Sequence, residues 1–123
     1  MAISLNTTLR NARSTAIVTE AGSGAILRVY TSAYGSTLYS STCAATLGTV
    51  SGGVLTFNAV GNATATGAGT AAIARLFKSD GTTMVIEGLT VGTSGTNIVI
   101  TNTTIAINDV VTTSSATITE GNA

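Results

Sequence analysis

Residues 70–90 read Thr-Ala-Ala-Ile-Ala-Arg-Leu-Phe-Lys-Ser-Asp-Gly-Thr-Thr-Met-Val-Ile-Glu-Gly-Leu-Thr, two apolar-alternating runs joined by Asp80-Gly81. Aspartate followed by glycine between such runs is a strong hairpin signal, because a two-residue type I′ turn needs positive φ at both central positions. The turn also fixes which residues lie opposite each other. The predicted pairs are Phe77 with Met84, Arg75 with Ile86, Leu76 with Val85 and Ala74 with Glu87.

Both faces of this hairpin carry apolar side chains, whereas a sheet with one wet side would show polar residues on that side. The hairpin is therefore expected in the middle of a two-layer β structure. Further strands are expected over 25–31, 44–50, 54–58, 97–102, 104–108 and 110–119, while 32–42 breaks the alternation and is expected to be a loop. In the later strands the residues expected to share a face are Ile98 with Ile100, Ile105 with Ile107, and Ala116 with Ile118.

These short strands, separated by glycine-containing turns in a chain without proline, are typical of an antiparallel β-sandwich or jelly roll. The predicted fold class is thus mainly β, with about eight strands and one N-terminal α-helix. Its length of 123 residues indicates a single domain, residues 1–123, with the helix within 1–22 and the sandwich over 25–119.

The one helix candidate covers residues 4–20, with Ser4 as its N-cap and Gly22 as its stop. An apolar stripe recurs at spacings of three and four, and Arg10 and Arg13 lie on the other side. Two interpretations stay open: the helix docks on the sheet by this stripe, or it is an arm that reaches a neighbouring subunit. The stripe consists of Leu5, Leu9, Ala12, Ala16 and Ile17.

The chain is weakly charged. Charged residues make up 8% of it, against about a quarter in an ordinary globular domain, and the mean hydropathy is +0.47. A lone soluble protein with so few surface charges would have a solubility problem. We therefore expect much of the surface to be covered in an assembly.

The inventory of side chains argues against several classes of function. Five basic residues and a net charge of zero provide no basic stripe for nucleic acid. No apolar run approaches the length of a membrane span, and no secretory signal is indicated. Without histidine, the single Cys43 has no base to activate it, and zinc sites and Ser-His-Asp triads cannot be built.

Each acidic residue has a structural explanation in a turn or near a segment end, so the chain is not expected to be an enzyme or to hold a cofactor or metal. A hydrolase that uses Glu87 with a second carboxylate remains the one enzymatic alternative. Arg75 lies among apolar residues, where we expect its stem to cover apolar surface at the sheet rim.

Two of the three tyrosines, Tyr34 and Tyr39, fall in the segment expected to be a loop. Tyrosines on a loop suit contact with a partner, because each offers a large rigid surface and a hydroxyl. The alternative is that they fold back over the core. Together with the helix arginines, the candidate partner contacts are Arg10, Arg13, Tyr34 and Tyr39.

Turn and strand signatures recur along the chain at residues 1–13, 51–59, 79–82, 91–95 and 118–123. These segments resemble a family of small virion proteins of tailed bacteriophages, and in particular the jelly-roll cement, or head decoration, proteins of short-tailed phages. The resemblance covers nearly the full length. Relatives often carry a proline-containing loop after the first strand, where this chain has residues 33–36, Ala-Tyr-Gly-Ser.

The resemblance implies a non-enzymatic role for a protein made in the host cytoplasm and assembled on the outer surface of the capsid. It would bridge neighbouring major capsid subunits, with self-association as a dimer or trimer. The alternative is a carbohydrate-binding or adhesin module on the virion surface or tail. That alternative is weakened by the few aromatic residues and the absence of tryptophan.

Overall fold

The chain folds as one helix followed by twelve short strands in a computed structural model that describes residues 6–119. The predicted mainly β chain with one N-terminal helix is confirmed. The elements are α1 (Thr7–Ala21), β1 (Ile26–Tyr30), the 3-10 turn η1 (Ser32–Tyr34), β2 (Thr37–Thr42), β3 (Gly48–Ser51), β4 (Val54–Phe57), β5 (Ala63–Thr64), β6 (Gly69–Thr70), β7 (Ile73–Phe77), β8 (Met84–Gly92), β9 (Ile98–Ile100), β10 (Thr104–Ile105), β11 (Val110–Val111) and β12 (Thr113–Thr119).

Eight of the strands form one sheet in the order β2-β1-β7-β8-β9-β12-β4-β3. The sheet is mixed, because β8 and β9 run parallel, with Val91 opposite Ile98. The expectation of a wholly antiparallel sheet was wrong at this pair. Between the two strands the chain makes an open loop rather than a tight turn, and the Asn97 side chain fastens it by accepting a hydrogen bond from Thr90 N at 3.0 Å.

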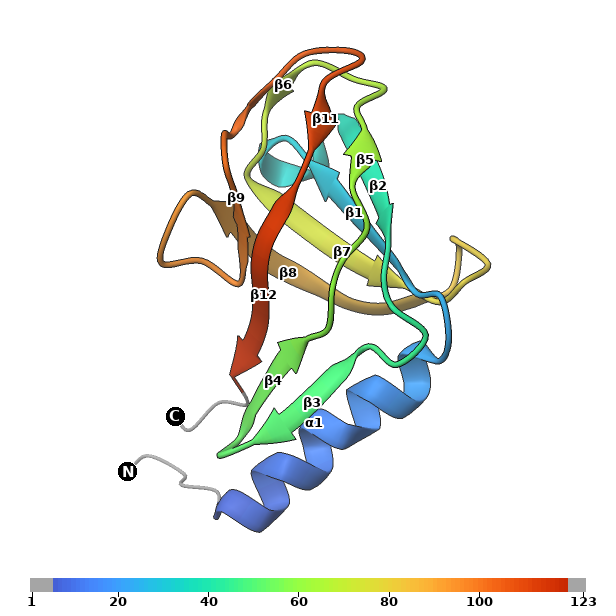
Figure 1. Cartoon of the computed structure of the whole chain (residues 1–123), viewed down its shortest axis with the longest axis vertical. Coiled ribbons are helices and arrows are strands. Elements are labelled where there is room, and N and C mark those ends of the chain that lie inside the picture. The colour runs from blue at the N-terminus through green and yellow to red at the C-terminus, as the bar shows by residue number, and fades with distance from the viewer. Residues whose placement is uncertain (1–5, 120–123) are drawn as a thin grey trace.

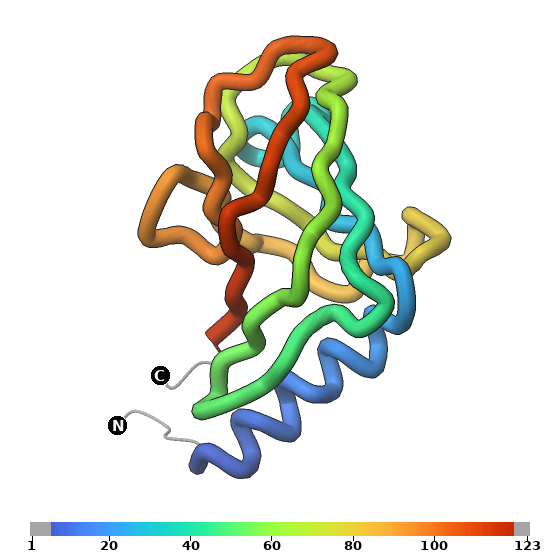
Figure 2. The backbone as a smooth tube through the Cα atoms, viewed as in Figure 1, coloured from blue at the N-terminus to red at the C-terminus, as the bar shows by residue number. Residues whose placement is uncertain are grey.

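The sheet curls strongly, so that segments far apart in the sheet order come together (Figures 1 and 2). The chain from β4 to β5 runs along β12 and then β11, with Leu55 opposite Ile118 and Ala63 opposite Val111. The same segment also reaches β2, because Thr66 N donates to Leu38 O at 2.9 Å. Residues 61–67 therefore cover the edge of β2 that would otherwise be unpaired.

The core lies inside this curl and is built from alternating residues of many strands. Leu27 and Val29 in β1 are fully buried, as are Leu55 in β4 and Ile98 in β9. The predicted shared faces of Ile98 with Ile100 and of Ala116 with Ile118 are confirmed, because all four side chains are buried. Ile105 is also buried, but its strand ends there and Ile107 is exposed, which overturns that pairing.

The central hairpin forms, but its turn and register differ from the expectation. Gly81 N donates to Lys78 O at 2.9 Å, so Ser79 and Asp80 occupy the centre of the turn, and Gly81 follows with φ 72°. Phe77 does lie opposite Met84, as predicted. Beyond that pair two register shifts place Leu76 opposite Ile86 and Ala74 opposite Leu89.

The segment expected to be a loop over 32–42 contains strand β2 instead. Its alternation is broken by a β-bulge: Val29 pairs with Tyr39 and Tyr30 with Thr37, which leaves Leu38 as the extra residue. Leu38 and Tyr39 are therefore buried next to each other. A search for strict alternation of apolar and polar residues misses a strand that contains such a bulge.

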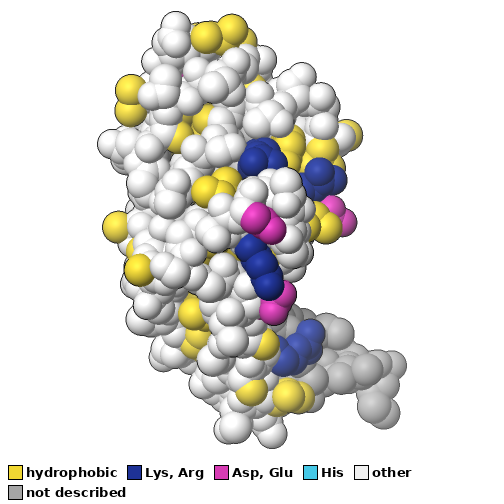
Figure 3. Space-filling view, turned by 90° about the vertical axis from the view of Figure 1, so that its right-hand side faces the viewer, with side chains coloured by type: hydrophobic (Ala, Val, Ile, Leu, Met, Phe, Trp, Pro, Cys, Tyr) yellow, Lys and Arg dark blue, Asp and Glu magenta, His cyan; other side chains and the backbone are white. Residues whose placement is uncertain are grey.

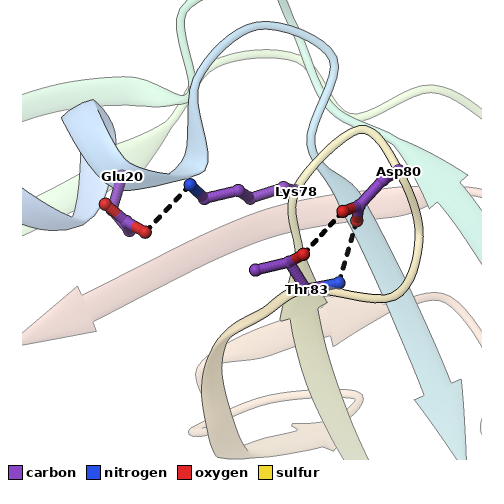
Figure 4. Close-up of polar contacts among 4 residues, drawn as sticks. All are labelled: Glu20, Lys78, Asp80 and Thr83. Atoms are coloured by element: carbon purple, nitrogen blue, oxygen red, sulfur yellow. Dashed lines mark hydrogen bonds and ion pairs between the residues drawn. The ribbon is translucent and has the colours of Figure 1, made fainter.

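The helix begins and ends at side chains suited to those positions. Asn6 is the N-cap, its Oδ1 accepting a hydrogen bond from Leu9 N at 2.8 Å, and Gly22 ends the helix as predicted with φ 69°. Ser4, the predicted N-cap, lies outside the described residues. At its C-terminal end the helix is tied to the hairpin by the ion pair between Glu20 and Lys78, with 3.0 Å between Oε1 and Nζ (Figure 4).

The face by which α1 docks on the rest of the protein shares only Ile17 with the described part of the predicted apolar stripe. Asn11 Oδ1 accepts a hydrogen bond from Gly53 N at 2.7 Å, and Ser14 is completely buried one turn later. Ala21 is buried on the same side, and Ile17 and Val18 are half-buried. The docking face is therefore centred on a hydrogen bond and on small side chains.

Candidate functional site

The predicted apolar stripe of α1 is divided: Ile17 packs against the core, whereas the rest of the described stripe points away from the protein. Leu9 is 45% exposed, and Ala12 and Ala16 are exposed one and two turns further on. We call these three residues the outer helix face. Leu5, the other end of the predicted stripe, lies outside the described residues. An apolar helix face that residues 6–119 leave uncovered is a surface that a partner can bury.

The two candidate arginines of α1 lie in different surroundings. Arg10 is half-buried, and its guanidinium lies over the turn of the β3–β4 hairpin, so close that a Cβ on Gly53 would lie 2.6 Å from Arg10 Cζ. Arg13 is exposed. Arg10 therefore contributes to the docking of the helix, whereas Arg13 remains accessible on the surface.

Tyr39, one of the candidate contact residues, lies in the core, as the alternative of tyrosines folded back over the core has it. Its side chain is 1% exposed within the core, and burial raises the pKa of its hydroxyl to about 12. The hydroxyl has no hydrogen-bond partner among the described residues. A partner protein has no access to this side chain.

Tyr34 folds back onto the sheet and forms the centre of a small cluster. Its hydroxyl accepts a hydrogen bond from Gly88 N at 2.8 Å, and Arg75 Cζ lies 3.7 Å from its ring centroid. Tyr30 meets Tyr34 edge to face, with ring centroids 5.3 Å apart. Glu87 lies beside Arg75, with 3.3 Å between Oε2 and Nε, so the arginine covers aromatic surface and stays paired at the rim.

This cluster forces an unusual backbone. Ala33 and Tyr34 have φ of 56° and 55°, in the left-handed region that non-glycine residues seldom adopt. The stacked Arg75 and the bond to Gly88 N hold Tyr34 there. Since one face of its ring is covered by the guanidinium, Tyr34 is not an open aromatic platform.

Charged side chains on the face turned to the viewer in Figure 3 gather at mid-height, around the central hairpin and the helix end. Arg28 also belongs to this region: its Cζ lies 4.6 Å from the Phe77 ring centroid, and its Nη1 donates to Gly81 O at 3.2 Å. Asp80 accepts hydrogen bonds from the Thr83 hydroxyl and from Thr83 N (Figure 4). These charged side chains stabilise the central hairpin of β7 and β8.

The remaining groups with reactive side chains are the Cys43 thiol and the acidic residues. Cys43 is buried, and burial raises the pKa of its thiol to about 11, which keeps it protonated at neutral pH. Within residues 6–119 no three histidine, cysteine or acidic side chains come close enough together to hold a metal ion. Over the same residues, no helix is long and apolar enough to cross a membrane.

Two features of the surface were missed in the sequence. One is the polar docking face of α1, for which the Asn11 and Ser14 spacing of three was the available signal. The other is the end of the molecule around the β10–β11 connection, where Ile107 and Val110 are 59% and 67% exposed. The alternating pattern there favoured a longer strand.

Comparison with known proteins adds no identification: no protein-family model, curated protein or solved structure matches the chain.

Proposed function

We propose that this protein is a structural component of a bacteriophage virion, a capsid cement or decoration protein that bridges neighbouring major capsid subunits and stabilises the head. The observation that carries the proposal is the outer helix face, an apolar surface on a chain with very few charges. The resemblance of the sequence to phage head decoration proteins supports the same role. No chemistry is required of a protein that acts in this way, and no cofactor enters the proposal.

The outer helix face is presented rigidly, which favours binding. The Asn6 cap, the bond between Asn11 and Gly53 and the Glu20–Lys78 ion pair fix both ends and the middle of α1. A preformed surface loses less conformational entropy when a partner binds it. Full burial of an exposed leucine contributes about 1.5–3 kcal/mol, and burial of the 45% of Leu9 that is exposed contributes roughly half of this. Many symmetric copies multiply such a weak contact through avidity.

We further infer that the curled sheet is a variant of the jelly roll that the resemblance implies. Support comes from the core, which lies between opposed parts of the sheet, and from the long course of β4–β5 along β11–β12. The protein would be made in the host cytoplasm and assembled on the outer surface of the capsid. Self-association as a dimer or trimer belongs to the same proposal.

A carbohydrate-binding or adhesin role is less well supported. Sugar platforms use open aromatic faces, and the described aromatic rings do not provide one. Tyr39 is buried, while Tyr34 and Phe77 are each covered by a guanidinium, from Arg75 and Arg28 respectively.

The test uses phage particles that lack this protein and are then supplied with purified variants. We expect the unmodified chain to bind the capsids and to delay DNA release on heating. Leu9→Asp should weaken binding at least about threefold, since loss of the apolar contact of Leu9 costs roughly 0.75–1.5 kcal/mol. Met84→Asp is the matched control, because Met84 is 48% exposed on β8, close to the 45% of Leu9.

Equal DNA release with and without the protein would refute the proposed function. Equal loss of binding for both variants would refute the role of the outer helix face, because the control removes a similar amount of exposed apolar surface elsewhere.

A further inference from the structure

The β10–β11 connection forms a tightly braced turn at one end of the molecule. Asp109 N donates to Ala106 O at 3.0 Å, and Ala106 N donates to Asp109 Oδ2 at 2.9 Å. Two further bonds tie the turn to β5, from Ala65 N to Asp109 O at 2.7 Å and from Asn108 N to Ala65 O at 2.8 Å. The backbone of this turn and the Asp109 carboxylate are therefore held in place.

The turn exposes two branched apolar side chains. Ile107 lies at its second position and Val110 directly after it, and both are among the most exposed large apolar residues described. Ile107 was expected to join Ile105 in the core, but the turn rotates it outward. Such residues on a rigid turn offer apolar surface to a ligand without an ordering cost.

A pocket of about 210 Å³ lies at this end of the molecule, and Val110 forms part of its rim. Its polar walls come from Thr101, Asn102, Thr104 and Asp109, and its apolar walls from Ile105 and Val111. Pockets for cofactors and drug-sized ligands are larger, about 300–1,000 Å³. The space fits a single amino-acid side chain.

Asp109 is the one charged side chain among the described residues that line the pocket. No ion pair to Asp109 exists among residues 6–119, whereas Glu20 and Glu87 have Lys78 and Arg75. One oxygen, Oδ2, is engaged by Ala106 N, and the other accepts no hydrogen bond from the described residues. The carboxylate is thus free to bind a cation from outside.

We propose that this pocket binds a basic side chain, lysine or arginine, presented by a partner protein. The aliphatic stem would lie against Val110 and Val111, and the charged head would reach Asp109, with the oxygens of Thr101 and Thr104 nearby. An anionic ligand would be repelled, and one carboxylate is too few for calcium. The inference rests on the proposed function only for the identity of the partner, which would then be the capsid.

The experiment titrates the isolated, isotope-labelled protein with N-acetyl-lysine methylamide and follows amide chemical shifts. We expect saturable shifts at Asn102, Thr104 and Val110. N-acetyl-norleucine methylamide, which has the stem without the charge, should produce clearly smaller shifts. High salt should weaken the lysine response.

Two variants test the role of the carboxylate. Asp109→Asn keeps an acceptor for Ala106 N but removes the charge, and it should weaken lysine binding by about threefold or more. Asn102→Asp keeps the acceptor for Thr104 N, which lies 2.9 Å from Asn102 Oδ1, and it should strengthen binding by adding a second charge. Asp80→Asn, at another turn carboxylate, is the control and should leave binding unchanged.

Equal responses to the lysine and norleucine analogues, or unchanged binding in both pocket variants, would overturn the proposal. So would shifts with a neutral sugar that exceed those with lysine. Because the titration needs no capsid, its failure leaves the helix-variant experiment unaffected, and the reverse also holds.

Discussion

At the scale of single residues, Asp80 shows how one carboxylate fixes the central hairpin. The hydroxyl of Thr83, its backbone N–H and that of Thr82 all donate to the carboxylate, and they lower its pKa from the ordinary 3.8 to about 2. These bonds favour the charged form in the folded state. They organise the turn around Ser79-Asp80 rather than the Asp80-Gly81 centre that the dipeptide indicated.

The lowered pKa predicts a pH dependence of stability. Because the folded pKa lies below the unfolded value, Asp80 contributes its full stabilisation above about pH 4, and the contribution is lost as the pH falls towards 2. Asp80→Asn should be less stable than the unmodified chain at pH 7, and the difference should shrink between pH 4 and 2. Urea unfolding of both proteins at each pH measures it, and a constant difference over this range would contradict the prediction.

Tyr39 illustrates the limit of residue-level reasoning about sites. In the sequence it stands among small polar residues, as a tyrosine on a binding loop does. Its burial follows from the bulge at Leu38, which turns two successive side chains inward. A β-bulge cannot be recognised in the local sequence pattern, because its position depends on the pairing with the partner strand.

At the scale of elements, the helix was found in the sequence, but its docking face was not. Hydrophobic periodicity selected the side with Leu9, Ala12 and Ala16, and the structure buries the side with Asn11 and Ser14. The turn of the β3–β4 hairpin lies close to the helix, and its Gly53 N–H needs a hydrogen-bond acceptor on the helix. This requirement is set by the hairpin, so it cannot be recognised in the helix sequence alone.

The contact between η1 and β8 is a second case of coupling between elements. Gly88 has φ 80° within the irregular part of β8, and its N–H bonds to the Tyr34 hydroxyl rather than to β7. The chain holds Ala33 and Tyr34 in a costly conformation to make this bond. The cluster with Arg75 then covers that end of the sheet.

Two substitutions at neighbouring residues of η1 should have opposite effects on stability. Tyr34→Phe removes the acceptor for Gly88 N and should cost about 1 kcal/mol of the free energy of unfolding. Ala33→Gly relieves the positive φ and should raise the free energy of unfolding by about 0.5–1 kcal/mol. Denaturant unfolding measures both, and a destabilised Ala33→Gly would argue against backbone strain at this turn.

At the scale of the whole molecule, the sequence predicted a mainly β chain, the helix and most strands, but not how the sheet closes. Alternation assigns inward and outward faces, as it did for Ile98, Ile100 and Ala116, and it carries no information on which distant strands pair. The parallel pair β8–β9 and the hydrogen bonds from residues 61–67 to β2 are set by the complete curl. The outer helix face and the pocket with Asp109 likewise depend on what the rest of the chain leaves uncovered.

Gly67 lies where the curl closes, and it provides a test of that closure. A Cβ at this position would lie 2.4 Å from Thr37 O, so alanine would force the segment away from β2. Gly67→Ala should therefore lower the free energy of unfolding by about 1–3 kcal/mol, as overpacking does. It should also speed hydrogen exchange at the amides of residues 66 and 67, which both donate to Leu38 O.

Ala68→Ser, at the exposed neighbour, is the control and should change neither quantity. Normal exchange protection in Gly67→Ala would mean that the curl does not depend on this contact, and that the edge of β2 is held by other parts of the sheet.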